Sequence, residues 1–193
     1  MLLAPASEPQ DIEALLTGER VRLVVYVRGF YPRDTLLRLW EAVEADGASL
    51  DILYGLRSSK ATEPVDVRGD PQDFLAYFSD EKLILLIVMT KDLGELVGFF
   101  WLSDVVPKFR ATVNLFVRKK FRGRHAVEAA RIFRDYAVHG LGFPTLWGLT
   151  PWKHSAVMGR WLGMKTVATL PNFQLIDGAA VDMYILKYEA IDA

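Results

Sequence analysis

The chain has 193 residues, of which 51% are hydrophobic and 24% are charged, and its formal net charge is −1 at pH 7. This composition is typical of a globular protein with a full hydrophobic core, and the near-neutral charge favours a small anionic ligand over a nucleic-acid partner. The chain contains no cysteine, which excludes disulfides, a cysteine nucleophile and thiolate metal sites, and its three histidines lack metal-ligand spacing, so no metal site is expected.

Residues 1–80 are predicted to form an N-terminal part that completes the fold and shapes a surface for an acceptor or a partner. Hydrophobic periodicity and turn residues place its elements in this order: a short helix at 11–16, a strand at 21–27, a helix at 34–45 with Asp34 as its N-cap, a short strand at 50–53, a surface loop at 57–70, and a short helix opened by Asp70 and Pro71. This part is expected to pack with the rest of the chain as one compact domain.

Residues 81–193 are predicted to form the core of the fold. The expected elements are strands at 82–89, 96–102 and 111–117, joined by turns at 91–94 and near Pro107, then a helix at 124–139 capped by Gly140, a strand at 145–149, a helix at 154–162 capped by Gly163, and strands at 165–170 and 181–186. Hairpins make the first three strands antiparallel, whereas a strand, helix, strand order requires a parallel crossover. The sequence therefore predicts an α/β (α+β) fold, with a mixed, mostly antiparallel sheet that has one parallel junction and is flanked by helices.

Neither a membrane span nor a secretion signal is predicted. The longest apolar run, Leu83 to Met89, is far too short to cross a bilayer, and the N-terminus lacks the basic-then-apolar pattern of a signal peptide. We therefore expect a cytoplasmic protein with no membrane partner.

A cluster of basic residues lies between the strand that ends at Val117 and the helix that follows it. Five of the seven residues from Arg118 to Arg124 are basic, against a neutral background. The N-terminus of a helix carries unpaired N–H groups and the positive end of the helix dipole, so it favours a phosphate group at the same place. This basic turn, residues 118–124, predicts a site for a phosphorylated cofactor; the alternative is a solvated surface loop.

The order of the elements, with a basic, glycine-containing turn before the first helix of the core, resembles the GNAT (Gcn5-related N-acetyltransferase) family over about residues 82–188. In that family the turn reads approximately Arg/Gln-x-x-Gly-x-Gly/Ala, and its backbone amides hold the pyrophosphate of coenzyme A. Here Arg122 keeps the first position, but His125 and Val127 stand where the family has glycine, which lets the backbone approach the phosphates closely. A register that starts at Lys120 would keep Gly123 as the first glycine and lose the last one.

The resemblance implies acetyl-CoA as the cofactor. The residues that it assigns to cofactor binding are Val117, Arg118, Arg122, Gly123, Arg124, His125, Ala126 and Val127. It further implies that the pantetheine arm pairs with backbone where the parallel strands part.

A second segment, Pro151 to Met164, is similar to the family's Asn-x-x-Ala-x-x-Leu-Tyr-x-x-x-Gly-Phe. Gly159 occupies the position of the tyrosine that often protonates the departing thiolate, so the usual general acid is missing. His154 is the candidate catalytic residue in its place, with Ser155 beside it, because imidazole titrates near neutrality. The alternative for both His125 and His154 is a solvent-facing residue at the start of a helix.

An acceptor amine would also need a base. Glu95 and Asp104, at the two ends of the central hairpin strand, are the nearest carboxylates in the sequence, although nothing in the sequence places either of them at the cofactor. No base is assigned from the sequence.

Two functions are compatible with these observations. The first is an acyl-CoA-dependent N-acetyltransferase that moves an acetyl group from acetyl-CoA to an amine of a small molecule or a protein. The second is a catalytically degenerate GNAT-fold structural or assembly protein, similar to small proteins encoded by tailed bacteriophages, which would place it in a virion; a homo-oligomer is compatible with either. The basic turn favours the enzyme, whereas the missing glycines and tyrosine motivate the second function.

Overall fold

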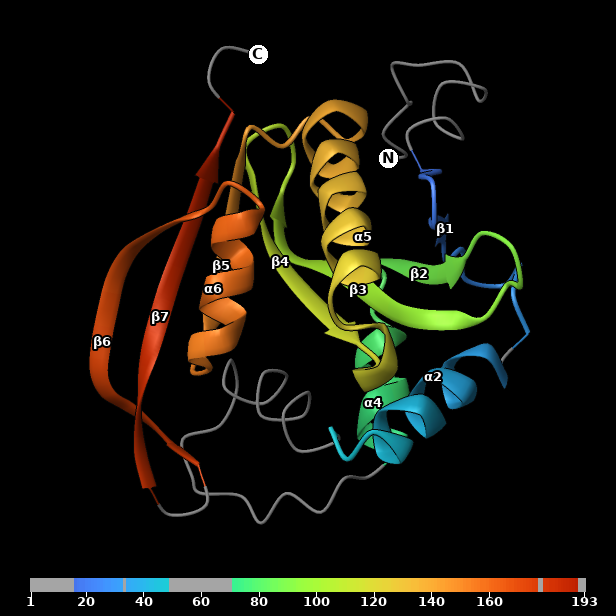
Figure 1. The fold of residues 1–193 in the computed structure, drawn as a ribbon, viewed down its shortest axis with the longest axis horizontal. Coiled ribbons are helices and arrows are strands. Elements are labelled where there is room, and N and C mark those ends of the chain that lie inside the picture. Colours follow the sequence, from blue (N-terminus) through green and yellow to red (C-terminus); the bar gives the residue numbers. More distant parts are fainter. Residues whose placement is uncertain (1–15, 33, 49–70, 177–178, 191–193) are drawn as a thin grey trace.

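The structure, a computed structural model, describes residues 16–32, 34–48, 71–176 and 179–190 of the chain. The helix predicted at 11–16, the strand at 50–53 and the loop at 57–70 fall almost entirely on other residues, so these predictions lie outside the described part. The remaining elements build one sheet with helices on both of its faces (Figure 1).

Seven strands of the described residues form a single sheet in the order β1-β2-β3-β4-β5-β7-β6. Their bounds are β1 (Val21–Val25), β2 (Ile84–Thr90), β3 (Leu96–Val106), β4 (Arg110–Val117), β5 (Thr145–Thr150), β6 (Lys165–Ile176) and β7 (Ala179–Glu189). Each neighbouring pair is antiparallel except β4 and β5, which run parallel. The predicted fold class is therefore confirmed, and the parallel junction lies at the predicted helix crossover.

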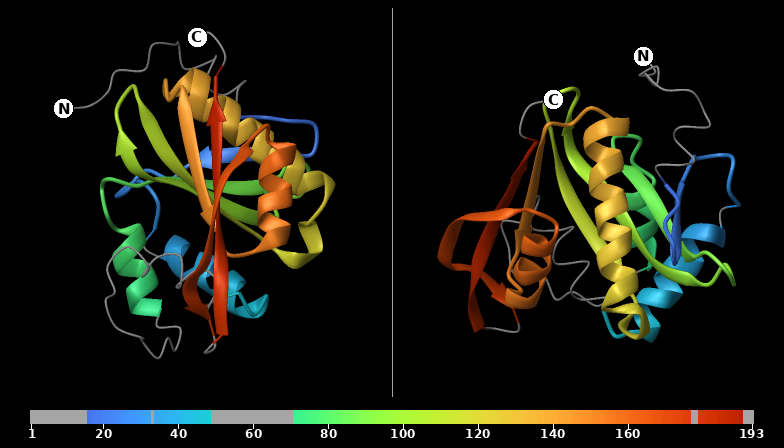
Figure 2. Two further views of the ribbon diagram at one scale, coloured as in Figure 1. Left: turned by 90° about the vertical axis from the view of Figure 1, so that its left-hand side faces the viewer. Right: turned by 45° about the horizontal axis from the view of Figure 1, so that its top comes forward.

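Helices cover both faces of the sheet (Figure 2). Over one face lie α5 (Arg124–Asp135), which continues into a single π-helical turn (Tyr136–Gly140), and α6 (Lys153–Trp161). Over the other face lie α2 (Asp34–Ala45) and α4 (Pro71–Phe78). No helix among the described residues is long and apolar enough to cross a membrane.

Strand β3 separates two hydrophobic cores because its side chains point alternately to the two faces of the sheet. Phe100 packs into the core under α5 and α6, whereas Phe99 and Trp101 pack into the core under α2 and α4. The rings of Phe74 and Phe78, from α4, lie edge-on against Phe99, with centroids 5.8 and 5.5 Å apart. This favourable ring geometry holds α4 against the middle of the sheet.

The ends of the elements agree with the sequence prediction to within two residues except in three strands, and one predicted cap is wrong. β3 runs to Val106, past its predicted end at Leu102. Gly163 has a φ of +81° and closes α6 with the hydrogen bonds of a Schellman motif, as predicted. The prediction of Gly140 as the left-handed cap of α5 is wrong, because the helix runs on through the π turn and the positive φ, +72°, falls at Gly142. Gly140 instead lies against the ring of Tyr136, where a Cβ would come within 2.7 Å of Cδ2. The other differences are in β6 and β7, which extend beyond the predicted strands through two register shifts in their pairing.

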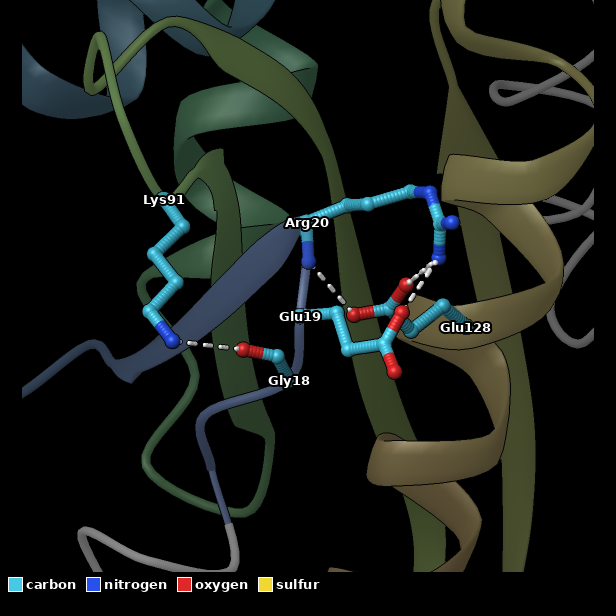
Figure 3. Close-up of polar contacts among 5 residues, drawn as sticks. All are labelled: Gly18, Glu19, Arg20, Lys91 and Glu128. Atoms are coloured by element: carbon cyan, nitrogen blue, oxygen red, sulfur yellow. Dashed lines mark hydrogen bonds and ion pairs between the residues drawn. The ribbon is translucent and has the colours of Figure 1, made fainter.

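A network of polar contacts ties α5 to the segment before β1 (Figure 3). The carboxylate of Glu128, on α5, accepts hydrogen bonds from the backbone N–H of Arg20 at 2.8 Å and from its guanidinium Nη1 at 3.1 Å. The same Nη1 lies 3.1 Å from a carboxylate oxygen of Glu19, and Lys91 donates to the carbonyl oxygen of Gly18 at 3.1 Å. The first half of α5 is therefore held against the segment before β1, and Lys91 ties that segment to the β2–β3 turn.

Candidate functional site

The parallel strands β4 and β5 part after three residue pairs. Residues 110–112 pair with residues 145–147, and no further pairing links the two strands within the described sheet. β4 continues to Val117 and β5 to Thr150, so the strands diverge toward their carboxyl ends. Open sheets bind ligands outside the carboxyl ends of such strands, because the parted backbones leave polar groups for a ligand.

A small apolar cavity lies next to this splayed junction, between α5 and α6. Its lining includes side chains of β4, α5, β5 and β7: Val113, Leu115, Phe133, Leu146 and Tyr188. The cavity has a volume of about 20 Å³, which is room for about one water molecule and not for a larger ligand. Arg134 borders the cavity and links the helices, because its Nη1 donates to the carbonyl oxygen of Leu162 at 3.1 Å.

The backbone at the start of α5 is open to a ligand. Gly123 precedes the helix with a φ of +117° and a ψ of −128°, a conformation that is essentially restricted to glycine. The first bond of the helix runs from the N–H of Val127 to the carbonyl oxygen of Gly123, so the N–H groups of residues 124–126 have no partner within the helix. A Cβ at Gly123 would meet no atom within 4 Å, which leaves space for an anion beside these N–H groups.

The basic turn makes two contacts with carboxylates, one through its backbone and one through a lysine side chain. Residues 119–121 form a single 3-10 turn, in which the backbone N–H of Lys119 donates to the carboxylate of Asp46. Lys120 forms an ion pair with Glu95. Glu95, one of the two carboxylates considered as a base, is therefore occupied at the basic turn.

The arginines of the basic turn keep donors for an anion. Arg122 and Arg124 are exposed, and Nε of Arg122 lies 3.5 Å from the carbonyl oxygen of Val117. Nε of Arg118 is buried and has no hydrogen-bond partner among the described residues. An orphaned, buried guanidinium nitrogen indicates a missing water or ion as its partner. Among the described residues, no group of three or more His, Asp or Glu side chains could hold a metal ion.

His125, which replaces a motif glycine, is directed toward the β2–β3 turn. Its ring lies edge-on against Phe121, with centroids 5.3 Å apart, and it lines a surface pocket of about 260 Å³ together with charged side chains that include Lys91 and Asp92. Hydrogen bonds from the backbone N–H groups of Leu93 and Asp92 lower the pKa of the Asp92 carboxyl, with a smaller contribution from His125. The imidazole therefore does not lie in the gap between β4 and β5.

His154 is the second residue of α6 and is exposed. Its ring stacks with that of Trp152 at a centroid distance of 6.3 Å, and it does not line the cavity between α5 and α6. Its role as a proton donor stays a prediction. Gly159, at the family's tyrosine position, is buried, and a Cβ there would lie 2.7 Å from Cδ1 of Leu186. A larger side chain would therefore fit only if Leu186 moved.

On the face of the sheet opposite α5, polar side chains from α4, β3 and β4 meet. Nε1 of Trp101 donates to the hydroxyl of Tyr77 at 3.3 Å, Nδ2 of Asn114 donates to Oγ of Ser103 at 3.0 Å, and Oγ of Ser103 donates to Oδ2 of Asp104 at 3.4 Å. Asp104 was considered from the sequence, whereas Tyr77, Ser103 and Asn114 were not. A signal was present, since Ser103 and Asn114 are polar residues within strands that are otherwise mainly apolar.

Known proteins resemble this chain in structure. No family model matches the sequence, and no curated protein matches it. A probable acetyltransferase of the GNAT family from Chromobacterium violaceum has a TM-score of 0.66 at 19% identity, over 98% of this chain and 93% of that one. Spermidine N-acetyltransferase from Vibrio cholerae, in complex with CoA and spermine, has a TM-score of 0.65 at 13% identity, over 90% and 97% of the two chains. The acetyltransferase of the GNAT family from Bacillus anthracis has a TM-score of 0.64 at 15% identity, over 91% and 98%. From these structural similarities and the order of its strands, the chain has the GNAT fold.

Proposed function

We propose that this chain is an acyl-CoA-dependent N-acetyltransferase, which transfers an acetyl group from acetyl-CoA to an amine. The observation that carries the proposal is that the splayed β4–β5 junction leads directly into an open, cationic N-terminus of α5. Ligands bind at such junctions in open sheets, and phosphate groups bind at helix N-termini. The Vibrio cholerae enzyme with this fold was solved with CoA, which supports this choice of cofactor. We expect the protein to act in the cytoplasm.

The basic turn has the donors that a diphosphate group requires. The N–H groups of residues 124–126, which have no partner within the helix, and the open space beside Gly123 suit phosphate oxygens. The buried Nε of Arg118 would gain the acceptor that it lacks, and Arg122 would add a charge-assisted contact. We therefore keep the proposed binding set as predicted from the sequence: Val117, Arg118, Arg122, Gly123, Arg124, His125, Ala126 and Val127.

Acetyl-CoA would supply an activated acetyl group as a thioester. Transfer forms a C–N bond and breaks the C–S bond, so the amine must lose a proton and the departing sulfur must gain one. We assign protonation of the departing sulfur to the imidazole of His154, because Gly159 leaves no tyrosine at the family's position. A tyrosine at position 159 would fit only if Leu186 moved.

The acceptor is proposed to be an amine of a small molecule or of a protein. One neighbour in structure is a spermidine N-acetyltransferase solved with spermine, and a dodecameric structure of spermidine N-acetyltransferase from the same organism is also similar to this chain. An amine acceptor and a homo-oligomer are therefore reasonable proposals for this chain, whereas nucleic acid and membranes are not proposed as partners.

A second candidate function is that of a GNAT-fold protein without turnover, with a structural or assembly role such as a component of a bacteriophage virion. It is favoured by His125 and Val127 in place of the motif glycines and by Gly159 in place of the tyrosine. The small volume of the cavity between α5 and α6, about 20 Å³, also favours it, because the cavity has no room for a cofactor arm.

Calorimetric titration with acetyl-CoA, with ATP as a control for general phosphate affinity, separates the two functions. For the enzyme we expect micromolar binding of acetyl-CoA but not of ATP. Arg122→Glu should weaken that binding by about 1–3 kcal/mol, a factor of about 5 to 150, because it replaces a charge-assisted contact by repulsion. Arg131→Glu, an exposed arginine further along α5, is the matched control and should bind as the wild type does. No binding at millimolar ligand would favour the structural role, and an unchanged affinity in Arg122→Glu would remove the basic turn from the site.

A further inference from the structure

The polar side chains on the α4 face of the sheet form a connected cluster, which consists of Tyr77, Ser103, Asp104 and Asn114. They come from three separate elements, α4, β3 and β4, and the hydrogen bonds from Asn114 to Ser103 and from Ser103 to Asp104 link β4 to the end of β3. Tyr77 joins them through Trp101, whose Nε1 donates to the tyrosine hydroxyl at 3.3 Å and which lies opposite Asn114 in the pairing of β3 with β4. Burial raises the pKa of this hydroxyl. The tyrosine therefore stays protonated at neutral pH and can donate or accept a hydrogen bond.

The backbone of β3 is distorted so that Asp104 joins this cluster. In a regular strand, Asp104 and Ser103 would point to opposite faces of the sheet. Asp104 instead has a φ of +49°, and the register with β4 shifts between Ser103 and Val106. Its Oδ2 consequently lies 3.4 Å from Oγ of Ser103, on the same face. A bulge that turns a side chain in this way, at the cost of an unfavourable φ, is common beside functional sites.

The cluster lies directly beside the splayed junction. Thr112 is the last residue of β4 that pairs with β5, and Asn114 follows it by two positions. Val113 and Leu115 line the cavity on the α5 face, so Asn114, between them, belongs to the opposite face. If a thioester lay between the parted strands with its cofactor on the α5 side, a second substrate would reach it from the side of this cluster.

The charge of Asp104 is available to a ligand. The side chain is exposed, and no Lys, Arg or His among the described residues forms an ion pair with it. A lone carboxylate beside neutral hydroxyl and amide groups attracts a cation, and a primary ammonium group can donate up to three hydrogen bonds to such oxygens.

We propose that Tyr77, Ser103, Asp104 and Asn114 form the acceptor subsite of the enzyme and that Asp104 binds the acceptor as a cationic amine, whose reacting nitrogen releases its extra proton to water before it attacks the thioester. This inference rests on the proposed acetyltransferase function and adds the charge of the acceptor and the residues that hold it. Ser103 and Asn114 are positioning residues, which hold the carboxylate of Asp104 on the α4 face.

The test compares the full-length wild type with Asp104→Asn and Asp92→Asn. Asparagine preserves the size of the side chain and tolerates a positive φ, so Asp104→Asn removes the charge and leaves the bulge intact. Asp92→Asn is the matched control, because Asp92 is an exposed aspartate in the turn at the other end of β3. Binding of acetyl-CoA is measured by calorimetry, and CoA release is measured with spermidine and putrescine as cationic acceptors and with aniline as an acceptor that is uncharged at neutral pH.

We expect the wild type to acetylate at least one of the cationic amines. Asp104→Asn should raise the KM for that amine by about tenfold or more, with the affinity for acetyl-CoA unchanged, and Asp92→Asn should change neither. Equal KM values in the wild type and Asp104→Asn would overturn the inference, as would a wild type that binds acetyl-CoA but acetylates only aniline or none of the three. Failure of the wild type to bind acetyl-CoA would instead refute the proposed function, and the subsite with it.

Discussion

Glu128 provides a quantitative test of how α5 is held in place. Its side chain is only 18% exposed, and its carboxylate accepts hydrogen bonds from the backbone and the guanidinium of Arg20. Glu128→Gln keeps one oxygen for the backbone N–H but turns an NH₂ group toward the guanidinium, so a charge-assisted contact becomes a donor facing a donor. Because this contact is partly open to solvent, we expect a loss of about 1–2 kcal/mol in the free energy of unfolding.

Glu19→Gln is a matched control, because Glu19 contacts the same Nη1 of Arg20 at the same 3.1 Å. The side chain of Glu19 is 83% exposed, so its ion pair is screened by water and its removal should leave stability nearly unchanged. Both variants are compared with the wild type by urea denaturation and thermal unfolding. For a chain of this size, Glu128→Gln should lower Tm by about 2–8 °C.

The pH dependence gives an independent check on Glu128. Burial alone would raise the pKa of Glu128, but hydrogen bonds from Arg20 and Val21 outweigh it and hold the pKa below its usual value. The stabilisation is therefore fully present above the unfolded pKa of about 4.3 and is lost as the pH falls through the folded pKa. The difference in stability between wild type and Glu128→Gln should shrink in that acidic range. Equal losses for Glu19→Gln and Glu128→Gln, or a difference that does not change with pH, would refute this account.

Further predictions concern three glycines and a buried tyrosine. Gly123→Ala should lower the free energy of unfolding by about 1–3 kcal/mol, because φ there is +117°, and it should weaken acetyl-CoA binding in calorimetry. Gly142→Ala, with a φ of +72° beyond the other end of α5, should also destabilise the fold but leave the affinity for acetyl-CoA unchanged. Gly159→Ala should lower the free energy of unfolding, measured by urea denaturation, by about 1–3 kcal/mol, because its Cβ would lie 2.7 Å from Leu186. An unaffected stability would show that α6 has room to move. Burial raises the pKa of Tyr136, so the stabilisation by its neutral hydroxyl is present below about pH 10 and is lost as the pH rises through the folded pKa. Tyr136→Phe should therefore flatten the fall in stability at alkaline pH, and an unchanged pH profile would contradict this.

The strands and helices of the core were predictable because their signals are local. The apolar spacing of α5 and the turns flanking β3 depend on residues within a few positions of each other, and the structure places these elements within a few residues of the prediction. The signal for the cap at Gly163 was equally local, because the left-handed residue that follows a helix is usually glycine. Gly140 failed as a cap because the helix continues through a π turn and the left-handed residue comes two positions later, at Gly142.

The candidate site was predictable only in part. The basic turn and the start of α5 are adjacent in sequence, so their coincidence was visible from the residues alone. The position of Asp104 was not, because it depends on the register between β3 and β4 and on the φ that the bulge imposes.

The sequence by itself determined the elements, their order and the cationic start of α5, since each of these follows from side chains that are close along the chain. Only the tertiary structure decided which distant groups meet. Glu128 pairs with Arg20 across 108 positions, and Tyr77, Ser103 and Asn114 come together from three elements. Such contacts depend on strand register and helix packing, in which a shift of one residue turns a side chain to the other face of the sheet.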